Sequence, residues 1–406
     1  MWKGKTVVLG VTGGIAAYKA AELASFLTQR GAAVEVVMTP AACQFITPLT
    51  FRELTGRPVA VDLFAPPARF EIQHVGLAER ADLVAVVPAT ANTIAKVAMG
   101  LADNLLTSVI LATRKPVLMA PAMNVGMYEN PVTQANLARL RDRGIVLVGP
   151  AEGRLACGAV GMGRLAPLEE IVFAMERLLG PGDYRGEKVL VTAGGTREAL
   201  DPVRFLGNRS SGRMGVALAQ AFARRGAAVT LVAGAMEVPP PPGVEVIRVE
   251  STAEMASAVL SRVEEATVVV MAGAPADFRP VEVADRKIKR ERAERLVVAL
   301  TPTEDIAAAV GERKRPGQIL VIFAAETDDL LANARRKLTA KKADLVVAND
   351  VTAPGSGFGS PTNRVHLITP TAARSLPLLP KEEVAWAIAD AVRAIRLGRD
   401  LDALER

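Results

Sequence analysis

The chain has 406 residues, of which 50% are hydrophobic and 23% charged, and its formal net charge at pH 7 is +6. This length exceeds one typical domain, so we expect two cores, filled mainly by aliphatic side chains because only 4% of residues are aromatic. The modest positive charge suits small anionic ligands. The basic clusters lack interleaved aromatic residues, which argues against nucleic acid as a partner.

Cysteine usage and hydropathy bear on where the protein works. The chain contains only Cys43 and Cys157, which cannot form a disulfide framework and are typical of a reducing compartment. The N-terminal sequence MWKGKTVVLGVTGGIAA superficially resembles a signal peptide, but we interpret it as a strand that leads into a helix. No apolar run approaches the roughly 20 residues that cross a bilayer. We therefore expect a soluble, cytoplasmic protein without a membrane partner.

Strand-like and helix-like segments alternate along the first half. We predict strands at 5–11, 33–38, 82–88, 115–121 and 144–149, and helices at 15–31, 93–99, 104–113, 131–141 and 168–179. Apolar strands that alternate with helices are typical of a parallel sheet covered on both faces.

A charged stretch with Gly and Pro, GPGDYRGEK, follows the last of these helices and predicts a domain boundary. We place the domains at 1–182 and 183–406. The second half restarts the pattern, with EKVLVTAGGT echoing GKTVVLGVTGG, although any two βαβ openings look alike. Further strands are predicted at 267–273, 318–325 and 343–350. We expect an α/β protein with two doubly wound, mostly parallel sheets.

Two strand ends in the first half carry candidate ligand-binding residues. Gly13 and Gly14 place backbone N–H groups at a helix N-terminus, which suits a phosphate, although a close strand–helix turn explains them equally well. They lack the three-glycine spacing of a dinucleotide fingerprint. PATAN, at 88–92, follows a later strand, and two polar strand ends in one sheet indicate a crevice.

Single residues in this half suggest acid–base chemistry. His74 precedes a short helix and could act as a general acid or base near pH 7, whereas we interpret His366 as structural. Asn124 follows a strand and could hold a carboxylate. Cys157 lies in EGRLACGAVGMGRLA, which we interpret as a mobile, glycine-rich loop that carries a reactive thiol.

The second half has three polar features of its own. Ser210, Ser211 and Gly212 begin a helix, where an oxyanion or phosphate could bind. The run ADRKIKRERAER is most simply a solvated loop. KLTAKKADLVVAND places Lys337, Lys341 and Lys342 on the turn that enters a strand, where they could face a triphosphate.

Taken in order, these motifs resemble a known family. GGIAAYK, PATAN, PAMN, His74 and ACG followed by G.GR are similar to the flavin-dependent cysteine decarboxylases. VTAGGTREALDPVRFLGNRSSGRMG, APADFRP, KIKR, FAAET, KKADLVVAND and GFGS resemble phosphopantothenate–cysteine ligases. The whole chain therefore resembles the bifunctional phosphopantothenoylcysteine decarboxylase/phosphopantothenate–cysteine ligases of coenzyme A synthesis.

For the first half, the resemblance implies a flavodoxin-like or Rossmann-like flavoprotein domain with bound FMN. The cofactor would oxidise the substrate thiol so that the carboxylate can leave, with His74 as acid or base, Asn124 holding the carboxylate and Cys157 returning a proton from a closing flap. The implied FMN contacts are Gly13, Gly14, Ile15, Thr39, Pro88, Ala89, Thr90, Asn92, Thr93 and Met123.

For the second half, the resemblance implies a Rossmann-like ligase domain. CTP and a divalent cation such as Mg²⁺ would convert 4′-phosphopantothenate into an acyl-cytidylate, stabilised by Asn208, which the amine of cysteine then attacks. The segment TPTEDI departs from the family's asparagine-proline-aspartate form, and the metal ligands stay unknown. The implied substrate and nucleotide contacts are Arg204, Ser210, Ser211, Gly212, Gly273, Ala274, Asp277, Lys287, Thr303, Glu304, Asp305, Ile306, Phe323, Lys337 and Lys341.

The resemblance also implies homo-oligomers: trimeric decarboxylase contacts with a shared flavin site, dimeric ligase contacts, and together a dodecamer. Three alternatives stay open. The first is a flavoprotein decarboxylase with an inactive ligase half, and the second is a regulatory flavoprotein that inhibits a partner protein. The third, a nicotinamide-dependent oxidoreductase, lacks the acidic residue expected after the second strand, where Thr39 and Pro40 stand.

Overall fold

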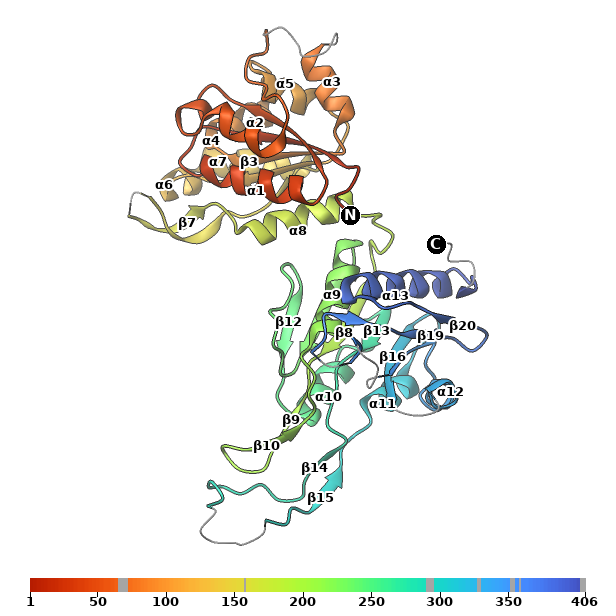
Figure 1. Cartoon of the computed structure of the whole chain (residues 1–406). Coiled ribbons are helices and arrows are strands. Elements are labelled where there is room, and N and C mark those ends of the chain that lie inside the picture. Colours follow the sequence, from red (N-terminus) through yellow and green to blue (C-terminus); the bar gives the residue numbers. More distant parts are fainter. Residues whose placement is uncertain are drawn as a thin grey trace. The chain divides into compact units, whose positions relative to one another are not determined.

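The computed structural model describes residues 1–64, 72–156, 158–289, 296–326, 330–350, 355–357 and 359–401. The chain divides into two compact units, Met1–Gly180 and Pro181–Arg406. Each unit is built around its own sheet with helices packed on it (Figure 1). The predicted strands and helices of the first half, and the three further strands predicted in the second, agree with the observed ones to within two residues at each end.

The first unit contains a five-stranded, fully parallel sheet with the strand order β2-β1-β3-β4-β5. Its strands are β1 (Thr6–Val11), β2 (Ala33–Met38), β3 (Leu83–Ala89), β4 (Val117–Pro121) and β5 (Val146–Leu147). Its helices are α1 (Ala17–Gln29), η1 (Ala42–Gln44), α2 (Pro48–Thr55), α3 (Gln73–Arg80), α4 (Ala91–Met99), α5 (Leu105–Ala112), α6 (Val125–Glu129), α7 (Pro131–Asp142) and α8 (Leu168–Leu179).

Helices cover both faces of this sheet, as the apolar strands predict. Successive side chains of a strand point to opposite faces, so Leu9 joins one core and its neighbour Val8 joins the other. The first core includes side chains of α1, α2 and α8, and the second includes side chains of α3, α4, α5 and α7. All residues of β3 are therefore buried.

The second unit contains an eight-stranded sheet with the order β12-β11-β8-β13-β16-β17-β19-β20. Six strands are parallel, and β19 and β20 add antiparallel pairs at one edge. The strands are β8 (Lys188–Ala193), β11 (Ala228–Ala233), β12 (Glu245–Arg248), β13 (Val268–Met271), β16 (Ile319–Glu326), β17 (Leu345–Asp350), β19 (His366–Ile368) and β20 (Ala373–Ser375).

Helices lie on both faces here as well. Side chains of α10, α11 and α12 share one core with the strands, while α9 packs on β8 and β11, and α13 packs on α9. The sheet is therefore doubly wound, as predicted. The helices are α9 (Arg213–Arg224), α10 (Thr252–Leu260), α11 (Ile306–Arg313), α12 (Leu330–Ala340) and α13 (Lys381–Arg396).

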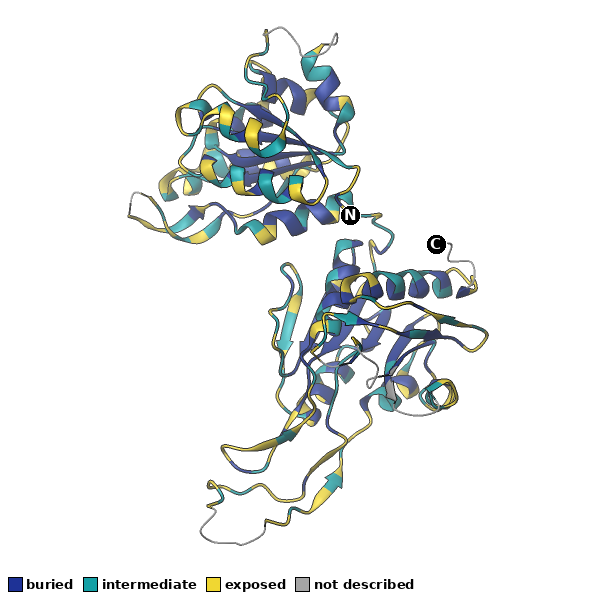
Figure 2. Cartoon of the chain, in the orientation of Figure 1, coloured by how far each residue is buried: buried dark blue, intermediate teal, exposed yellow. Residues whose placement is uncertain are grey.

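Short antiparallel ribbons extend from the second sheet. β9 (Arg197–Ala199) pairs with β10 (Phe205–Gly207), and β14 (Phe278–Pro280) pairs with β15 (Leu300–Pro302); we call these two ribbons the arm (Figure 1). The central strands of both sheets are dark blue in Figure 2, whereas the arm is largely yellow and teal. The remaining strands are β6 (Ala151–Arg154), β7 (Val160–Arg164), β18 (Thr362–Asn363) and β21 (Leu379–Pro380).

Candidate active sites

In each sheet the direction of strand order reverses between two neighbouring parallel strands. The reversal lies between β1 and β3 in the first unit and between β8 and β13 in the second. Open α/β sheets bind ligands at this position, outside the carboxyl ends of the strands. Each unit has a pocket there, which we call the first pocket and the second pocket.

The first pocket has a volume of about 1200 Å³ and collects the segments that follow β1, β2, β3 and β4. It therefore brings together residues that the sequence had placed at separate strand ends. Ala89 is an exception, because its side chain is fully buried within β3 and does not line the pocket. The predicted residues that line it are Gly13, Gly14, Ile15, Thr39, Pro88, Thr90, Asn92, Thr93, Met123 and Asn124.

Gly13 lets the turn after β1 approach the segment after β2. A Cβ atom at Gly13 would lie 2.5 Å from Cβ and 2.8 Å from the carbonyl carbon of Ala41. The turn leads into α1, whose N-cap residue Ala16 makes no side-chain capping hydrogen bond. The backbone N–H groups of this helix end therefore border the pocket without a side-chain acceptor, as a phosphate-binding helix end requires.

The start of α4, the next helix at the first pocket, is capped by a side chain. Thr12 Oγ1 donates a hydrogen bond of 2.7 Å to the carbonyl of Pro88 and accepts one of 3.0 Å from the N–H of Thr90. Thr90 Oγ1 in turn accepts a hydrogen bond from the N–H of Thr93 at the start of α4. The segment after β3 is thus held against the segment after β1 by hydrogen bonds.

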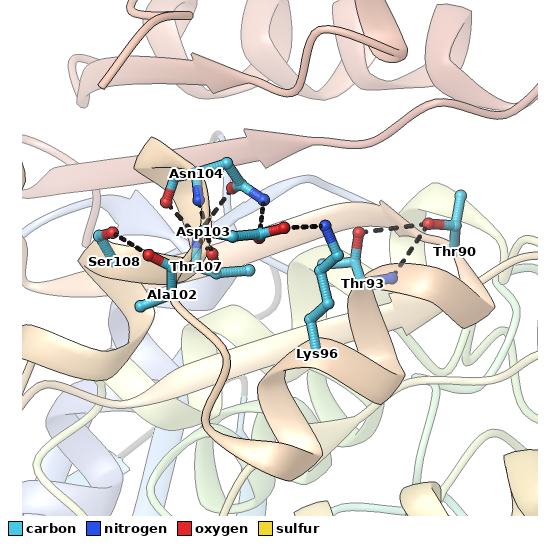
Figure 3. A network of polar contacts seen from close by, with 8 residues as sticks. All are labelled: Thr90, Thr93, Lys96, Ala102, Asp103, Asn104, Thr107 and Ser108. Carbon is cyan, nitrogen blue, oxygen red and sulfur yellow. Dashed lines mark hydrogen bonds and ion pairs between the residues drawn. The ribbon is translucent and has the colours of Figure 1, made fainter. Parts of the chain in front are cut away.

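A polar network continues from α4 to α5 (Figure 3). Lys96 Nζ lies 2.6 Å from Asp103 Oδ2, and Asn104 Nδ2 donates to Asp103 Oδ1 at 3.0 Å. The hydrogen bond from Lys96 lowers the pKa of Asp103. Asn104 also forms a capping box with Thr107 at the start of α5. Lys96, Asp103 and Asn104 all line the first pocket, where the ion pair balances the charge of Lys96.

The segment around Cys157, which the sequence predicts as a mobile loop, begins and ends in strands. Cys157 itself lies outside the described residues, but β6 and β7 on either side of it form an antiparallel ribbon. The ribbon packs so closely on the segment after β4 that a Cβ atom at Gly163 would lie 2.3 Å from the carbonyl oxygen of Met123. Arg154 and Arg164 of the ribbon line the first pocket.

Among the predicted catalytic residues of the first unit that the structure describes, His74 is the one that does not line the first pocket. It is the second residue of α3, so it lies within the helix rather than before it. Asn124, by contrast, lines the pocket and caps α6, with its Oδ1 accepting a hydrogen bond of 2.9 Å from the N–H of Gly126. The carboxamide of Asn124 is therefore held in one orientation.

The second pocket has a volume of about 470 Å³ and lies among the starts of α9, α11 and α13. Asn208 reaches it from the arm, and its Nδ2 donates to the carbonyls of Ala274 at 3.2 Å and Pro275 at 2.9 Å. The predicted residues that line it are Asn208, Ser210, Ser211, Gly212, Gly273, Ala274, Asp277, Thr303, Glu304, Asp305, Ile306, Phe323, Lys337 and Lys341.

The two predicted lysines of this pocket come from two structural contexts, not one. Lys337 lies in the last turn of α12, whereas Lys341 follows the end of that helix, so the prediction that both stand on a turn was wrong for Lys337. The helical repeat of α12 overrides the turn expected from the polar residues nearby. Lys341 Nζ lies 3.0 Å from Asp305 Oδ2, and Asp305 caps α11.

Two predicted residues, Arg204 and Lys287, do not line the second pocket. Arg204 lies in the turn between β9 and β10, and Lys287 lies between β14 and β15, so both belong to the arm. Conversely, the pocket includes Asn349, Asn363 and Lys381, which the sequence did not point to, and Arg213, which adjoins the phosphate site predicted at Ser210, Ser211 and Gly212. The GFGS motif, which precedes Asn363, was the nearest available signal.

In the ranges that the structure describes, no group of three or more His, Cys, Asp or Glu side chains could hold a metal ion. Within the same ranges, no helix has the length and apolar character needed to cross a membrane.

The fold and the two pockets define a two-unit α/β protein, with one pocket at the switch point of each sheet. Comparison with known proteins narrows this class. The family model "Flavoprotein" matches residues 1–180, and "DNA/pantothenate metabolism flavoprotein C-terminal domain" matches residues 184–395.

Known relatives match both units of the chain. Proteins called coenzyme A biosynthesis bifunctional protein CoaBC are 47% identical over 386 residues in Vibrio cholerae, 45% over 400 in Bacillus subtilis and 43% over 392 in Escherichia coli. The matches span 95–97% of this chain and 97–98% of each relative. The chain therefore belongs to the family of bifunctional coenzyme A biosynthesis proteins, and it is a bifunctional enzyme.

Proposed function

We propose that this enzyme joins cysteine to 4′-phosphopantothenate with CTP, and then decarboxylates the 4′-phosphopantothenoylcysteine to 4′-phosphopantetheine with FMN. Residues 1–182 are assigned the decarboxylation and residues 183–406 the ligation. The observation that carries this proposal is the presence of one pocket at each sheet's switch point, in a chain that matches bifunctional relatives over nearly its whole length.

The residues of the first pocket fit FMN. Its volume of about 1200 Å³ accommodates a large planar cofactor, and the uncapped start of α1 suits a phosphate. Ile15 and Met127 line the pocket with side chains that are 63% and 50% exposed. A flat, apolar ring system would cover such side chains. The glycine at position 13 allows the segment after β2 to pack closely against this end of the pocket.

When bound, FMN supplies a two-electron acceptor that allows the substrate thiol to be oxidised before its carboxylate leaves. Asn124 holds the carboxylate with its fixed carboxamide. Arg154 and Arg164 line the same pocket and attract the phosphorylated substrate. Cys157, between the two strands of the ribbon, donates the final proton, and a thiol with a pKa of about 8.5 is a suitable donor at neutral pH.

In the second pocket, CTP is a substrate and Mg²⁺ is proposed to enter with its phosphates. Lys337 and Lys341 face the negative charge that develops when the carboxylate attacks the nucleotide. Asn208 is anchored by two backbone carbonyls and stabilises the acyl-cytidylate. Asp277, Phe323 and the backbone at Gly273 contact the remainder of the nucleotide.

Each unit is proposed to complete its site in a homo-oligomer, trimeric for the first unit and dimeric for the second. The support is that His74 does not line the first pocket of its own chain, nor do Arg204 and Lys287 line the second. The arm also exposes large apolar side chains, which favour burial against another chain. These are Val203, Phe205, Phe278, Val281, Val283, Leu296, Val297 and Leu300.

The test is product analysis by mass spectrometry with 4′-phosphopantothenate, cysteine, CTP and magnesium. We expect a ligation product and a second product that is lighter by one carbon dioxide, from a protein with flavin absorbance. A colourless protein that fails to bind added FMN would exclude the first reaction. Ligation that proceeds equally well with ATP would exclude the preference for CTP.

The Cys157→Ala variant tests the assignment of the proton donor. Release of carbon dioxide should continue, because the thiol of this residue acts only after that step. The saturated product 4′-phosphopantetheine should not form. A normal yield of 4′-phosphopantetheine from the variant would remove Cys157 from the mechanism.

A further inference from the structure

The turn that carries Lys341 has an unusual backbone. It lies between the end of α12 at Ala340 and the start of β17 at Leu345. Among the described residues, Lys342 is the one non-glycine residue with a left-handed backbone, with a φ of 49°. An L-residue keeps this conformation where the surrounding structure enforces it. The residue next to a lysine of the second pocket is therefore held by contacts from other segments.

One of these contacts comes from the last turn of α11. A Cβ atom at Gly311 would lie 2.0 Å from the carbonyl oxygen of Lys341 and 2.8 Å from its carbonyl carbon, so this position requires glycine. At the other end of the same helix, the N-cap residue Asp305 has its Oδ2 3.0 Å from Lys341 Nζ. α11 thus contacts both the backbone and the ammonium group of Lys341.

The other contact comes from Lys314, the C-cap residue of α11. Its Nζ donates a hydrogen bond of 2.8 Å to the carbonyl of Lys342 and lies 2.8 and 2.9 Å from the two carboxylate oxygens of Asp344. Asp344 Oδ2 also accepts a hydrogen bond of 2.7 Å from the N–H of Leu320 in β16. The carbonyl of the left-handed residue is therefore tied to α11 and, through Asp344, to the sheet.

Lys314 does more than balance the dipole of α11. A cation at a helix C-terminus is favourable in itself, but Arg313 in the last turn of α11 supplies such a charge too. In the part of the chain that the structure describes, Arg313 forms no hydrogen bond to the turn. Neither Lys314 nor Asp344 lines the second pocket, so both act on it only through the turn.

We propose that Lys314 is a positioning residue for ligation, which holds the left-handed turn together with Asp344 and thereby directs the ammonium group of Lys341 into the second pocket. This inference rests on the proposed function, in which Lys341 faces the phosphates of CTP. Without Lys314 the turn relaxes, and the cation loses its fixed direction toward the nucleotide. A misplacement of about 1 Å from a change far from the reacting atoms costs up to about a hundredfold in rate.

The direct test is a double-mutant cycle in the full-length protein, with the KM for CTP as the measured quantity. Lys314→Met should raise this KM about tenfold and leave the KM for cysteine unchanged. In a Lys341→Ala background, Lys314→Met should change the KM for CTP less than about twofold, because both residues act through one ammonium group. Effects of the two substitutions that simply multiply would overturn the proposal.

Two further variants separate positioning from a general loss of stability. Lys314→Arg keeps a cation that reaches Asp344 and the carbonyl of Lys342, so its KM for CTP should stay within about threefold of the unmodified value. Arg313→Met is the matched control, because it removes the neighbouring, exposed cation from the same helix end. Its KM for CTP should not change. If Lys314→Met fails to fold, Lys314→Gln provides the same cycle with a polar side chain.

Amine labelling tests the positioning of Lys341 without ligation. The ligand-free protein is acetylated with acetic anhydride, and the rate at each lysine is followed by peptide mass spectrometry. The side chain of Lys341 is 24% exposed beside Asp305, and its labelling should become several times faster in Lys314→Met. Lys337, fixed on α12, should keep its rate. An unchanged rate at Lys341 would overturn the proposal, whereas an unmodified protein that does not use CTP would contradict the proposed function alone.

Discussion

The buried carboxylate of Asp201 accepts a hydrogen bond from the backbone N–H of Ile288, with 3.1 Å between Oδ2 and N. Its Oδ1 accepts hydrogen bonds of 2.8 Å from the N–H groups of Val203 and Arg204. One side chain therefore ties the turn that carries Arg204 to the segment that carries Lys287. Asp201 thus positions the two residues that the family resemblance assigns to substrates but that do not line the pocket.

Asp201→Asn should therefore impair ligation without affecting decarboxylation. An Asn side chain can keep Oδ1 as an acceptor, but its NH₂ group cannot accept from Ile288, so this part of the arm loses an anchor. We expect kcat/KM for ligation to fall about tenfold, the loss expected for one hydrogen bond to a charged group. Decarboxylation of supplied 4′-phosphopantothenoylcysteine by the same protein is the internal control. Equal ligation rates in Asp201→Asn and the unmodified protein would show that the hydrogen bond from Ile288 is dispensable.

The same carboxylate predicts how the arm responds to pH. Burial raises the pKa of Asp201, but the hydrogen bonds from Ile288, Val203 and Arg204 outweigh it and lower the pKa below its ordinary value of 3.8. A carboxylate with a lowered pKa stabilises the fold above its unfolded pKa, and this stabilisation is lost as the pH falls through the folded value. Amide protection factors, which are corrected for the intrinsic exchange rate at each pH, should therefore stay high for Val203, Arg204 and Ile288 at pH 5 and fall only below about pH 4. Protection of these amides that is already lost at pH 6 would contradict this assignment.

Gly13→Ala should reduce flavin binding. The new Cβ would lie 2.5 Å from the Cβ of Ala41, so the turn after β1 must move, and overpacking of this kind costs about 1–3 kcal/mol. We expect the FMN content of the purified protein to fall roughly tenfold or more. In Gly14→Ala the nearest contact is 3.5 Å, to Thr90 Cγ2, so this variant should fold normally. Full flavin occupancy in Gly13→Ala would contradict the close approach.

Mixing two inactive variants tests whether His74 acts across a trimer contact. His74→Asn and Asn124→Ala should each lose decarboxylation when assembled alone. After partial dissociation and reassembly together, some sites would combine the intact His74 of one chain with the intact Asn124 of another. About a quarter of the original activity should return for an equal, random mixture at a site shared by two chains. If the reassembled mixtures stay inactive, His74 and Asn124 must act together in a site formed by one chain.

Arg225→Met should destabilise the second unit. This guanidinium is 3% exposed, bonds Asp183 and Asp390, and lies over the ring of Trp386. Removing the buried cation leaves the carboxylates of Asp183 and Asp390 unpaired, but these side chains are 24% and 41% exposed and stay hydrated, so we expect a cost of about 1–2 kcal/mol. Urea unfolding followed by Trp386 fluorescence reports on this unit in a Trp2→Phe background, since Trp2 and Trp386 are the two tryptophans. The urea concentration at which flavin absorbance is lost, which reports on the first unit, should not change.

Local patterns were sufficient to predict most elements of the fold. The strand at 33–38 coincides with β2 and the helix at 168–179 coincides with α8, because strand and helix periodicities depend on neighbours along the chain. The polar strand ends also followed from the sequence. In a parallel sheet all carboxyl ends lie at one edge, so Gly13, Thr90 and Asn124 were expected to meet.

Local patterns did not predict the contacts between segments that lie far apart along the chain. Nothing in the spacing of LLPKEEVAW indicates that Lys381, in the last helix, lies beside Arg213, because that position depends on how α13 packs on α9. The ribbon on either side of Cys157 was mistaken for a free loop, because glycines promote turns and also allow close contact with a neighbouring backbone.

The sequence by itself determined the two α/β units, the pockets' strand ends and the family resemblance, since these depend on local periodicity and on ordered motifs. Only the tertiary structure decided which side chains share a pocket. It brought Lys381 and Asn363 into the second pocket and left Arg204 and Lys287 on the arm. The physical reason is that chain-distant contacts are selected by the burial of whole elements against each other, which no short segment encodes alone.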